Sequence, residues 1–331
     1  MKVYKDGLRS DFFGVPKSVI LGEVGCGVIT EDEFSVWCRD RLGRVVEEGE
    51  RLGIKLSFSG RVEFTLLGEV KGDFFSAMNE ERECVYSIYN NINISNIQYN
   101  ILGERERAFD IGYLDALEFC NTVSLLRYLV KREFFAHKPT FMPKPISTKE
   151  GAGFKIKMKI SGEREVEARF LGGLALHSPE YTVFTNSCAN SYPRLNSKDC
   201  PHYVCVGEGQ DMLVRRIKEE GGVYELAFPD NSCNCYLCVI SLILAGEMGV
   251  LDRGRTVDEI EELNPVVIKD LVRLPTTLYE AIVVSEGSGF MQAVLGERYK
   301  REYFSLKRAE SEEFDDKSTE EEYIKKYFPL L

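Results

Sequence analysis

Apolar and polar positions follow a helical period near the start of the chain. T-E-D-E at residues 30–33 has the pattern of a capping box, in which side chains satisfy the first free N–H groups of a helix. The residues after it predict an amphipathic helix that reaches to about residue 52. Its expected apolar face consists of Phe34, Trp37, Leu42, Val45 and Val46.

The next segments carry the shorter period of strands. Residues 54–59 and 62–67 predict two strands, and residues 92–102 predict a third. A long helix is then predicted over residues 108–135, and the chain from residue 238 onward is expected to be mainly helical. The charged stretch 310–322 is interpreted as a solvated surface or a frayed tail.

Residues 154–160, F-K-I-K-M-K-I, alternate apolar residues with lysine. Because successive side chains of a strand point to opposite faces, Lys155, Lys157 and Lys159 are predicted to lie on one face. One interpretation is an edge strand whose charges prevent aggregation. The other is a strand whose lysines face a binding site.

Composition and charge narrow the class of protein. A chain of 331 residues can form one large domain, or two unequal ones, with an ample core. Its 42 basic and 53 acidic residues give a net charge of −11, which argues against nucleic acid or an anionic membrane as a general partner. The first 25 residues lack the apolar segment of a secretion signal, and the longest apolar run, residues 236–246, is too short to cross a bilayer. We therefore expect a cytoplasmic protein.

Ten cysteines without a secretion signal indicate reduced thiols rather than a disulfide framework. Cys233, Cys235 and Cys238 form a C-x-C-x-x-C cluster, a spacing that can ligate zinc or an iron–sulfur centre. The same segment also predicts the start of a helix, where cysteines serve equally well as small core residues. Both interpretations stay open, and the chain's three histidines do not suggest a histidine-based metal site.

Short segments of the chain resemble the glutamine synthetase catalytic domain, in the same order. They are TFMPKP (140–145), GAGFK (151–155), NSYPRL (190–195), PDNSCNCYL (229–237) and LPTTLYEA (274–281). Each segment is a weak signal alone, but their collinear order is typical of common descent. The resemblance extends over residues 8–300.

This resemblance implies an α+β fold, with a curved antiparallel sheet backed by helices. Residues 1–30 resemble a remnant of the family's N-terminal β-grasp lobe, without the D-G-S-S loop that should follow, and residues 31–331 correspond to the catalytic domain. The ring of subunits usual in the family needs that lobe. The expected partner is therefore either further copies in a smaller homo-oligomer or a complete glutamine synthetase homologue.

The family phosphorylates a glutamate carboxylate with ATP and lets ammonia displace the phosphate, using divalent ions held mainly by carboxylates. By resemblance, the metal-ligand positions fall on Arg61, Glu63, Tyr99, Glu106, Lys155 and Glu225. A shift of one residue in the alignment would replace Tyr99 by Asn100. Only three acids remain, and Arg61 and Lys155 have become cations. Side-chain charges are thus predicted to replace part of the metal charge, leaving Glu63 and Glu106 for weak Mg²⁺ binding and no ion beside Arg61, Lys155 and Glu225.

The substrate and phosphate positions are also altered. By resemblance, Arg194, Asp199 and Arg215 keep catalytic positions, and Lys155, Lys157, Lys159 and Arg215 could hold phosphate groups. Glu150 replaces an asparagine that helps hold the amino acid, and Gln210 and Ala227 replace two arginines of the phosphate clamp. Loss of clamp charges removes transition-state stabilisation.

The sequence leaves three functions open. The first is a non-catalytic relative that senses a small amino acid or nucleotide, or regulates a partner. The second is an ATP-dependent carboxylate–amine ligase of the γ-glutamyl type, with altered substrate and metal use. The third is a metal–thiolate or redox role for the cysteine cluster. ATP and Mg²⁺ are the candidate cofactors, and neither is assigned.

Overall fold

The computed structural model describes residues 33–68, 74–92, 96–147, 149, 151–197, 200, 202–209, 211–218, 220–252, 259–260, 267, 269–314 and 318–331. The strands are β1 (Lys55–Leu66), β2 (Ile97–Ile101), β3 (Glu106–Leu114), β4 (Pro139–Thr140), β5 (Phe154–Ser161), β6 (Val206–Gly207), β7 (Val214–Arg216), β8 (Val223–Leu226) and β9 (Glu259–Ile260). The helices are α2 (Glu33–Arg51), α3 (Phe74–Asn91), α4 (Ala116–Glu133), α5 (Arg164–Leu176), α6 (Ser178–Thr185), α7 (Ser191–Leu195), α8 (Cys235–Leu251), α10 (Leu278–Glu286), α11 (Gly289–Glu313) and α12 (Glu320–Tyr327), with a short 3₁₀ turn η1 (Phe135–His137). The predicted N-terminal remnant, residues 1–30, lies outside the described residues.

The strands of the described residues form one nine-stranded sheet in the order β2-β3-β1-β5-β8-β7-β6-β9, and β4 pairs with β1 beside this path. Every pair from β2 to β7 is antiparallel, whereas β6 pairs in parallel with both β7 and β9. The sheet is curved and open, and helices back it. The predicted fold class is therefore confirmed, with a parallel edge that the sequence pattern did not indicate.

One face of the sheet packs against helices, and this face holds the core. On β5 the apolar residues Phe154, Ile156, Met158 and Ile160 are buried, whereas the intervening lysines are partly or fully exposed. Phe119 of α4 stacks on Phe154 of β5 and on Phe58 of β1. The alternation predicted for this strand is confirmed, and its charged face lies away from α4.

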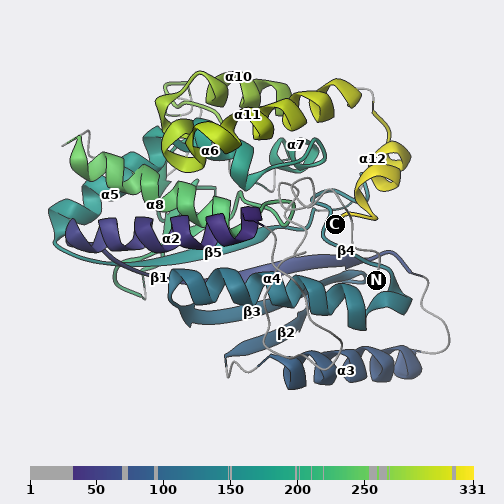
Figure 1. Cartoon of the computed structure of the whole chain (residues 1–331). Helices are drawn as coiled ribbons and strands as arrows, with labels where there is room; N and C mark the ends of the chain where they lie inside the picture. Colours follow the sequence, from purple (N-terminus) through teal and green to yellow (C-terminus); the bar gives the residue numbers. More distant parts are fainter. Residues whose placement is uncertain are drawn as a thin grey trace.

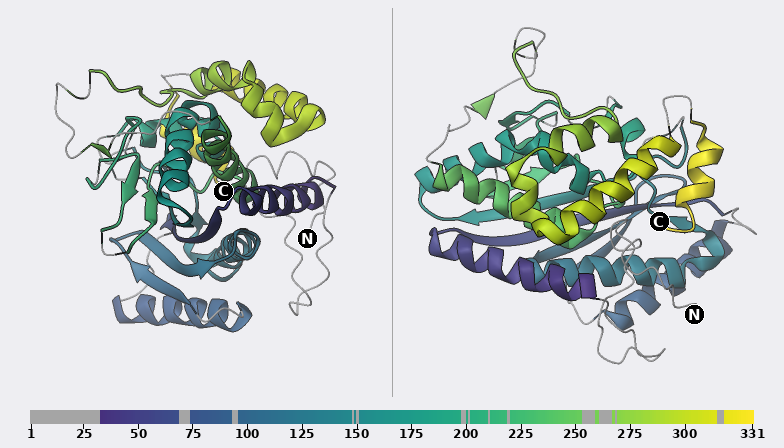
Figure 2. Two further views of the ribbon diagram at one scale, coloured as in Figure 1. Left: turned by 90° about the vertical axis from the view of Figure 1, so that its left-hand side faces the viewer. Right: turned by 45° about the horizontal axis from the view of Figure 1, so that its top comes forward.

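Helices cover the sheet in layers. α8 contacts α2, α5, α6 and α4, so this almost wholly buried helix is the centre of the helical layer. α10 and α11 lie at one end of the molecule and α3 at the other, with the strands between them (Figure 1; Figure 2, left). No helix among the described residues is long and apolar enough to cross a lipid bilayer.

Four predicted segments differ from the structure. The strand expected over residues 92–102 begins only at Ile97, as β2. The charged stretch 310–322 is not simply a solvated surface or frayed tail, because Glu310 is buried on α11 and α12 begins at Glu320.

The two strands expected in residues 54–67 are one strand, β1, whose register with β3 shifts between Phe58 and Gly60. The predicted long helix begins only at Ala116, because residues 108–114 belong to β3. Asp115 is the N-cap of α4 and accepts a hydrogen bond from the Glu118 N–H at 2.8 Å, which fixes the boundary. The helix predicted near the start of the chain is confirmed as α2, with Phe34, Leu42 and Val45 buried.

Candidate functional site

The exposed face of the sheet brings predicted site residues from separate strands together. Arg61 on β1 lies directly opposite Lys155 on β5 and opposite Asp110 on β3. On β8, Glu225 lies opposite Lys157 of β5 and Arg215 of β7. Directly opposed residues share a face of the sheet, so these side chains form one charged surface.

This surface borders a pocket of about 610 Å³, here called the central pocket. The predicted residues that line it are Arg61, Glu63, Glu106, Lys155, Arg194 and Glu225. Lys157, Lys159 and Arg215 are not among its described lining residues. Asp199, Glu150 and Gln210 lie outside the part of the chain that the structure describes.

Arg61 is held by a carboxylate that the sequence reasoning missed. Its Nε and Nη2 donate to the two carboxylate oxygens of Asp110 at 2.7 and 2.9 Å, a bidentate arrangement. The hydrogen bond to Asp110 raises the pKa of Arg61 above its ordinary value, and the nearby charges of Glu63 and Glu225 act in the same direction. The strand alternation of residues 106, 108 and 110 places Asp110 on the face of Glu106, but the helix predicted over residues 108–135 conceals this signal.

Glu63 is engaged by the chain on both oxygens. Its Oε2 accepts a hydrogen bond from the Gly153 N–H at 2.7 Å, and its Oε1 lies 3.8 Å from the Lys155 ammonium. The Asn231 amide donates to the carbonyls of both Glu63 and Gly153 at 2.8 Å, which ties strand β1 to the G-A-G turn. A side chain on Gly153 would collide with the Arg194 guanidinium, since a Cβ there would lie 2.5 Å from Nη2. The glycine turn therefore serves close packing around Glu63.

The other two acids are engaged as well. Glu225 accepts a hydrogen bond from Arg215 Nη2 at 2.6 Å, and both side chains are mostly buried. Glu106 accepts one from the Arg105 N–H at 3.1 Å, so its carboxylate folds back on its own turn. Lys149, also at the pocket, pairs with Glu104 at 3.2 Å.

Arg194 lines the central pocket, but its donors are directed to the main chain. Nη1 donates to the Phe228 carbonyl at 2.8 Å, and Nη2 donates to the Ala227 carbonyl at 2.9 Å. Ala227 itself lines the pocket where the resemblance expects a clamp arginine. Arg194 thus supports the end of β8, and no clamp side chain extends from position 227.

The placement of Tyr99 in the metal shell is wrong. Tyr99 lies opposite Phe109, which lies opposite Val62, so it belongs to the apolar face of the sheet. Its hydroxyl donates to Glu81 at 2.8 Å, and Glu81 forms a buried ion pair with Arg107 at 2.7 Å. Asn100 faces the site instead, and its amide donates to Asp110 at 2.9 Å. Of the two residues that the alignment left open, Asn100 is the one on the face of Arg61 and Asp110, because strand β2 alternates its faces.

The residues present do not fit a divalent ion beside Arg61, Lys155 and Glu225. Two of the three are cations, and Glu225 already pairs with Arg215. Among the described residues, no group of three or more His, Cys, Asp or Glu side chains is arranged to hold a metal. Glu63 and Glu106 remain as two carboxylates on the pocket wall, a sparse ligand set for Mg²⁺.

The cysteine cluster lies in the core at the start of α8. Cys233, Cys235 and Cys238 are fully or almost fully buried, and Asn234 caps the helix. Arg127 donates to the Cys233 carbonyl at 2.7 Å. Burial opposes ionisation of the Cys233 thiol, yet its hydrogen bond with Cys238 and the Arg127 charge lower its pKa. These contacts agree with the small-core-residue interpretation, and the metal–thiolate alternative has no ligand group among the described residues.

The open, curved sheet backed by helices places the protein in the α+β class. Comparison with known proteins identifies its family. The sequence model of the glutamine synthetase catalytic domain matches residues 102–326. The chain therefore belongs to the glutamine synthetase family.

Curated relatives are distant and longer. Glutamine synthetase of Pyrococcus abyssi is 26% identical over 314 residues, which cover 83% of this chain and 71% of that protein. The enzyme of Halobacterium salinarum is 27% identical over 252 residues, and the chain spans only 56% of its length.

Solved structures share the fold. The ADP complex of GmaS superposes with a TM-score of 0.72 at 21% identity and covers 87% of this chain and 76% of that one. A novel glutamine synthase homologue gives a TM-score of 0.74 at 17% identity, with 89% and 75% covered.

Proposed function

We propose that this protein is a glutamine synthetase relative without glutamine synthetase activity, in which ion pairs replace the metals of the site and the central pocket binds a small ligand for sensing or regulation. The observation that carries the proposal is the pairing of the site itself. Arg61 is fixed by Asp110, Glu63 by Lys155 and Gly153, and Glu225 by Arg215.

The physical reason is competition for the same carboxylates. A divalent ion that coordinates Glu63 or Glu225 has to displace a cation or an N–H donor that is already in contact. It would also lie close to the positive charges of Arg61 and Lys155. Without the ions, the phosphates of ATP lose the groups that neutralise their developing charge. The missing clamp arginine at Ala227 weakens that stabilisation further.

The partner of such a protein is a further copy of the chain or a complete glutamine synthetase, and its ligand is a small amino acid or nucleotide. The central pocket has the size of an ordinary small-molecule site. Family membership supports the choice of partners, and the volume and charged lining of the pocket support a small polar ligand.

Calorimetric titration with Mn²⁺, and with ATP in the presence and absence of Mg²⁺, tests the proposal. The wild-type protein is expected to give no heat with Mn²⁺, and no ADP is expected with glutamate and ammonia. A double variant, Arg61→Glu with Lys155→His, restores an acid and a histidine at these positions and is expected to gain Mn²⁺ binding. The matched control, Arg44→Glu with Lys325→His, makes the same changes at exposed positions. Tight binding of two Mn²⁺ by the wild type would contradict the proposal.

A second function, an ATP-dependent carboxylate–amine ligase with altered substrate, is favoured by one observation. Lys149 and Lys155 at the central pocket each keep about a third of their side chain exposed, so both are accessible to an anionic group. ATP hydrolysis that depends on an added amine, and that disappears in Glu63→Gln, would favour this alternative over the first.

A further inference from the structure

A second pocket, of about 520 Å³, borders the helix that carries Arg194. It is here called the α7 pocket, because Tyr192 and Pro193 of α7 line it, whereas Arg194 of the same helix lines the central pocket. The two pockets share no lining residue among those described. The α7 pocket is therefore a separate site, and neither the motifs nor the family resemblance assigned it a role.

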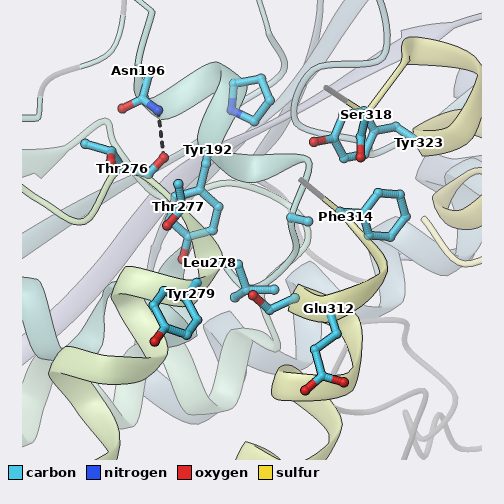
Figure 3. Close-up of a pocket in the computed structure, with 13 residues that line it drawn as sticks. Tyr192, Asn196, Thr276, Thr277, Leu278, Tyr279, Glu312, Phe314, Ser318 and Tyr323 are labelled. Atoms are coloured by element: carbon cyan, nitrogen blue, oxygen red, sulfur yellow. Dashed lines mark hydrogen bonds between the residues drawn. The ribbon is translucent and has the colours of Figure 1, made fainter. Parts of the chain in front are cut away.

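Two sides of the pocket come from distant parts of the chain (Figure 3). One side carries Tyr192 and the segment 276–279, and the other carries Glu312, Phe314 and Tyr323. Asn196 donates to the Thr276 carbonyl at 2.8 Å, which joins the end of α7 to the first residue of that segment.

A helix cap and a pair of stacked rings hold the two sides of the α7 pocket in place. Thr277 caps α10 by accepting a hydrogen bond from the Glu280 N–H at 3.1 Å. On the other side, the rings of Phe314 and Tyr323 stack with centroids 5.0 Å apart. The pocket is thus built from positioned groups, with a volume in the range of small-molecule sites.

The side chains that line the α7 pocket favour a positively charged ligand. Four aromatic rings line the pocket: Tyr192, Tyr279, Phe314 and Tyr323. Among the described lining residues, Glu312 is the only charged side chain, and it forms no ion pair with another described residue. Aromatic faces and a carboxylate both attract cations, and both disfavour a carboxylate or phosphate ligand.

We propose that the α7 pocket binds a small organic cation, an ammonium group attached to an aromatic or aliphatic body. The ammonium group lies beside the exposed Glu312, and the apolar body packs against the tyrosine and phenylalanine rings. This site does not depend on the function proposed for the central pocket.

Three probes with one carbon skeleton test the proposal: phenethylammonium, 2-phenylethanol and phenylacetate, titrated into the full chain by calorimetry. Phenethylammonium is expected to bind with a dissociation constant of about 1 mM or lower, the neutral alcohol more weakly, and phenylacetate not at all. Glu312→Gln is expected to weaken phenethylammonium binding about fivefold and to leave the alcohol unchanged, because only the charged probe uses the carboxylate.

Control variants locate the site. Glu302→Gln removes the same charge from an exposed position of α11 and is expected to change nothing. Tyr279→Ala removes a ring that is 66% exposed, so the fold is kept while binding of both phenethylammonium and the alcohol weakens. Lys155→Met, in the central pocket, is expected to leave all three titrations unchanged.

Four outcomes would overturn the proposal. They are equal or tighter binding of phenylacetate, an unchanged affinity in Glu312→Gln, loss of binding in Lys155→Met, and no binding of any probe at concentrations on the order of 10 mM.

Discussion

The ion pair of Arg61 with Asp110 beside the central pocket and the ion pair of Lys307 with Glu310 on α11 have the same chemistry in different surroundings. Arg61 and Asp110 keep 34% and 36% of their side chains exposed, whereas Lys307 and Glu310 keep 0% and 2%. Water and salt screen the first pair, so its contribution to stability is small. The second pair is enclosed, and neither partner can lose the other without leaving a buried charge.

The enclosed pair also joins separate parts of the fold. Glu310 accepts a hydrogen bond from the Ala189 N–H at 3.1 Å, and Lys307 donates to the Ser187 carbonyl. The C-terminal helices are thereby fastened to the segment just before α7. Arg61 and Asp110 are partly exposed and lie on neighbouring strands, so we expect substitutions of this pair to leave the fold intact.

Breaking the enclosed pair is expected to have the largest effect. Lys307→Met leaves Glu310 charged and buried, which should lower the free energy of unfolding by about 3–5 kcal/mol. Urea denaturation followed by circular dichroism measures it. The exposed Lys325→Met is the control, with no expected change. Adding Glu310→Gln to Lys307→Met should recover part of the loss, and a double variant less stable than the single one would contradict this account.

Glu247 is a buried acid that forms no ion pair with another described residue. It lies on α8 and packs against Gly49 of α2, and its Oε1 has no hydrogen-bond partner in the described part of the chain. Burial, and then the charge of Glu48, raise the pKa of Glu247 to about 8 from an ordinary value of 4.5. The folded state therefore holds this proton more tightly than the unfolded state does. The stability it contributes is complete below about pH 4.5 and is lost as the pH rises through 8.

Glu247→Gln removes this titration. The variant is expected to lose less stability than the wild type between pH 5 and pH 9, by about 1–2 kcal/mol after allowing for solvent screening. Urea denaturation at several pH values gives the slope. Glu50→Gln, an exposed acid of α2, should keep the wild-type slope. Equal slopes in wild type and Glu247→Gln would show that the acid is ionised in the folded protein.

Tyr99 tests which face of the sheet belongs to the pocket. Tyr99→Phe loses the hydrogen bond to Glu81 beside the buried Arg107 pair, so the free energy of unfolding should fall by about 1 kcal/mol. Mn²⁺ and ATP titrations of the variant should match the wild type. A change in those titrations with unaltered stability would return Tyr99 to the pocket.

The smallest effect on stability is expected at the open pair. Arg61→Gln should change the free energy of unfolding by less than about 1 kcal/mol, because the pair with Asp110 is partly exposed. The same variant removes the cation that pairs with Asp110 and a positive charge beside Glu63, so Mn²⁺ should bind more tightly than to the wild type. Exposed Arg44→Gln should leave both measurements unchanged. A large loss of stability in Arg61→Gln would show that the partly exposed pair contributes as much to the free energy of unfolding as the enclosed Lys307 pair does.

Local pattern in the sequence was sufficient to determine several features of this protein. The alternation of lysine with apolar residues in β5 decided which side of that strand is charged, because strand geometry has a period of two. The capping signal and apolar stripe predicted α2, and the ordered motifs indicated the family. The motifs also indicated that two cations, Arg61 and Lys155, lie near the remaining acids of the site.

Only the tertiary structure decided how the side chains of the site are paired. The register between strands set Asp110 opposite Arg61 and turned Asn100, rather than Tyr99, toward the site. Packing directed Arg194 to main-chain carbonyls, and folding placed residues near 192, 277 and 323 around one pocket. The physical reason is that a period assigns a residue to a side of its own element, whereas a partner across the sheet or from a distant helix is chosen by register and packing, which no local pattern contains.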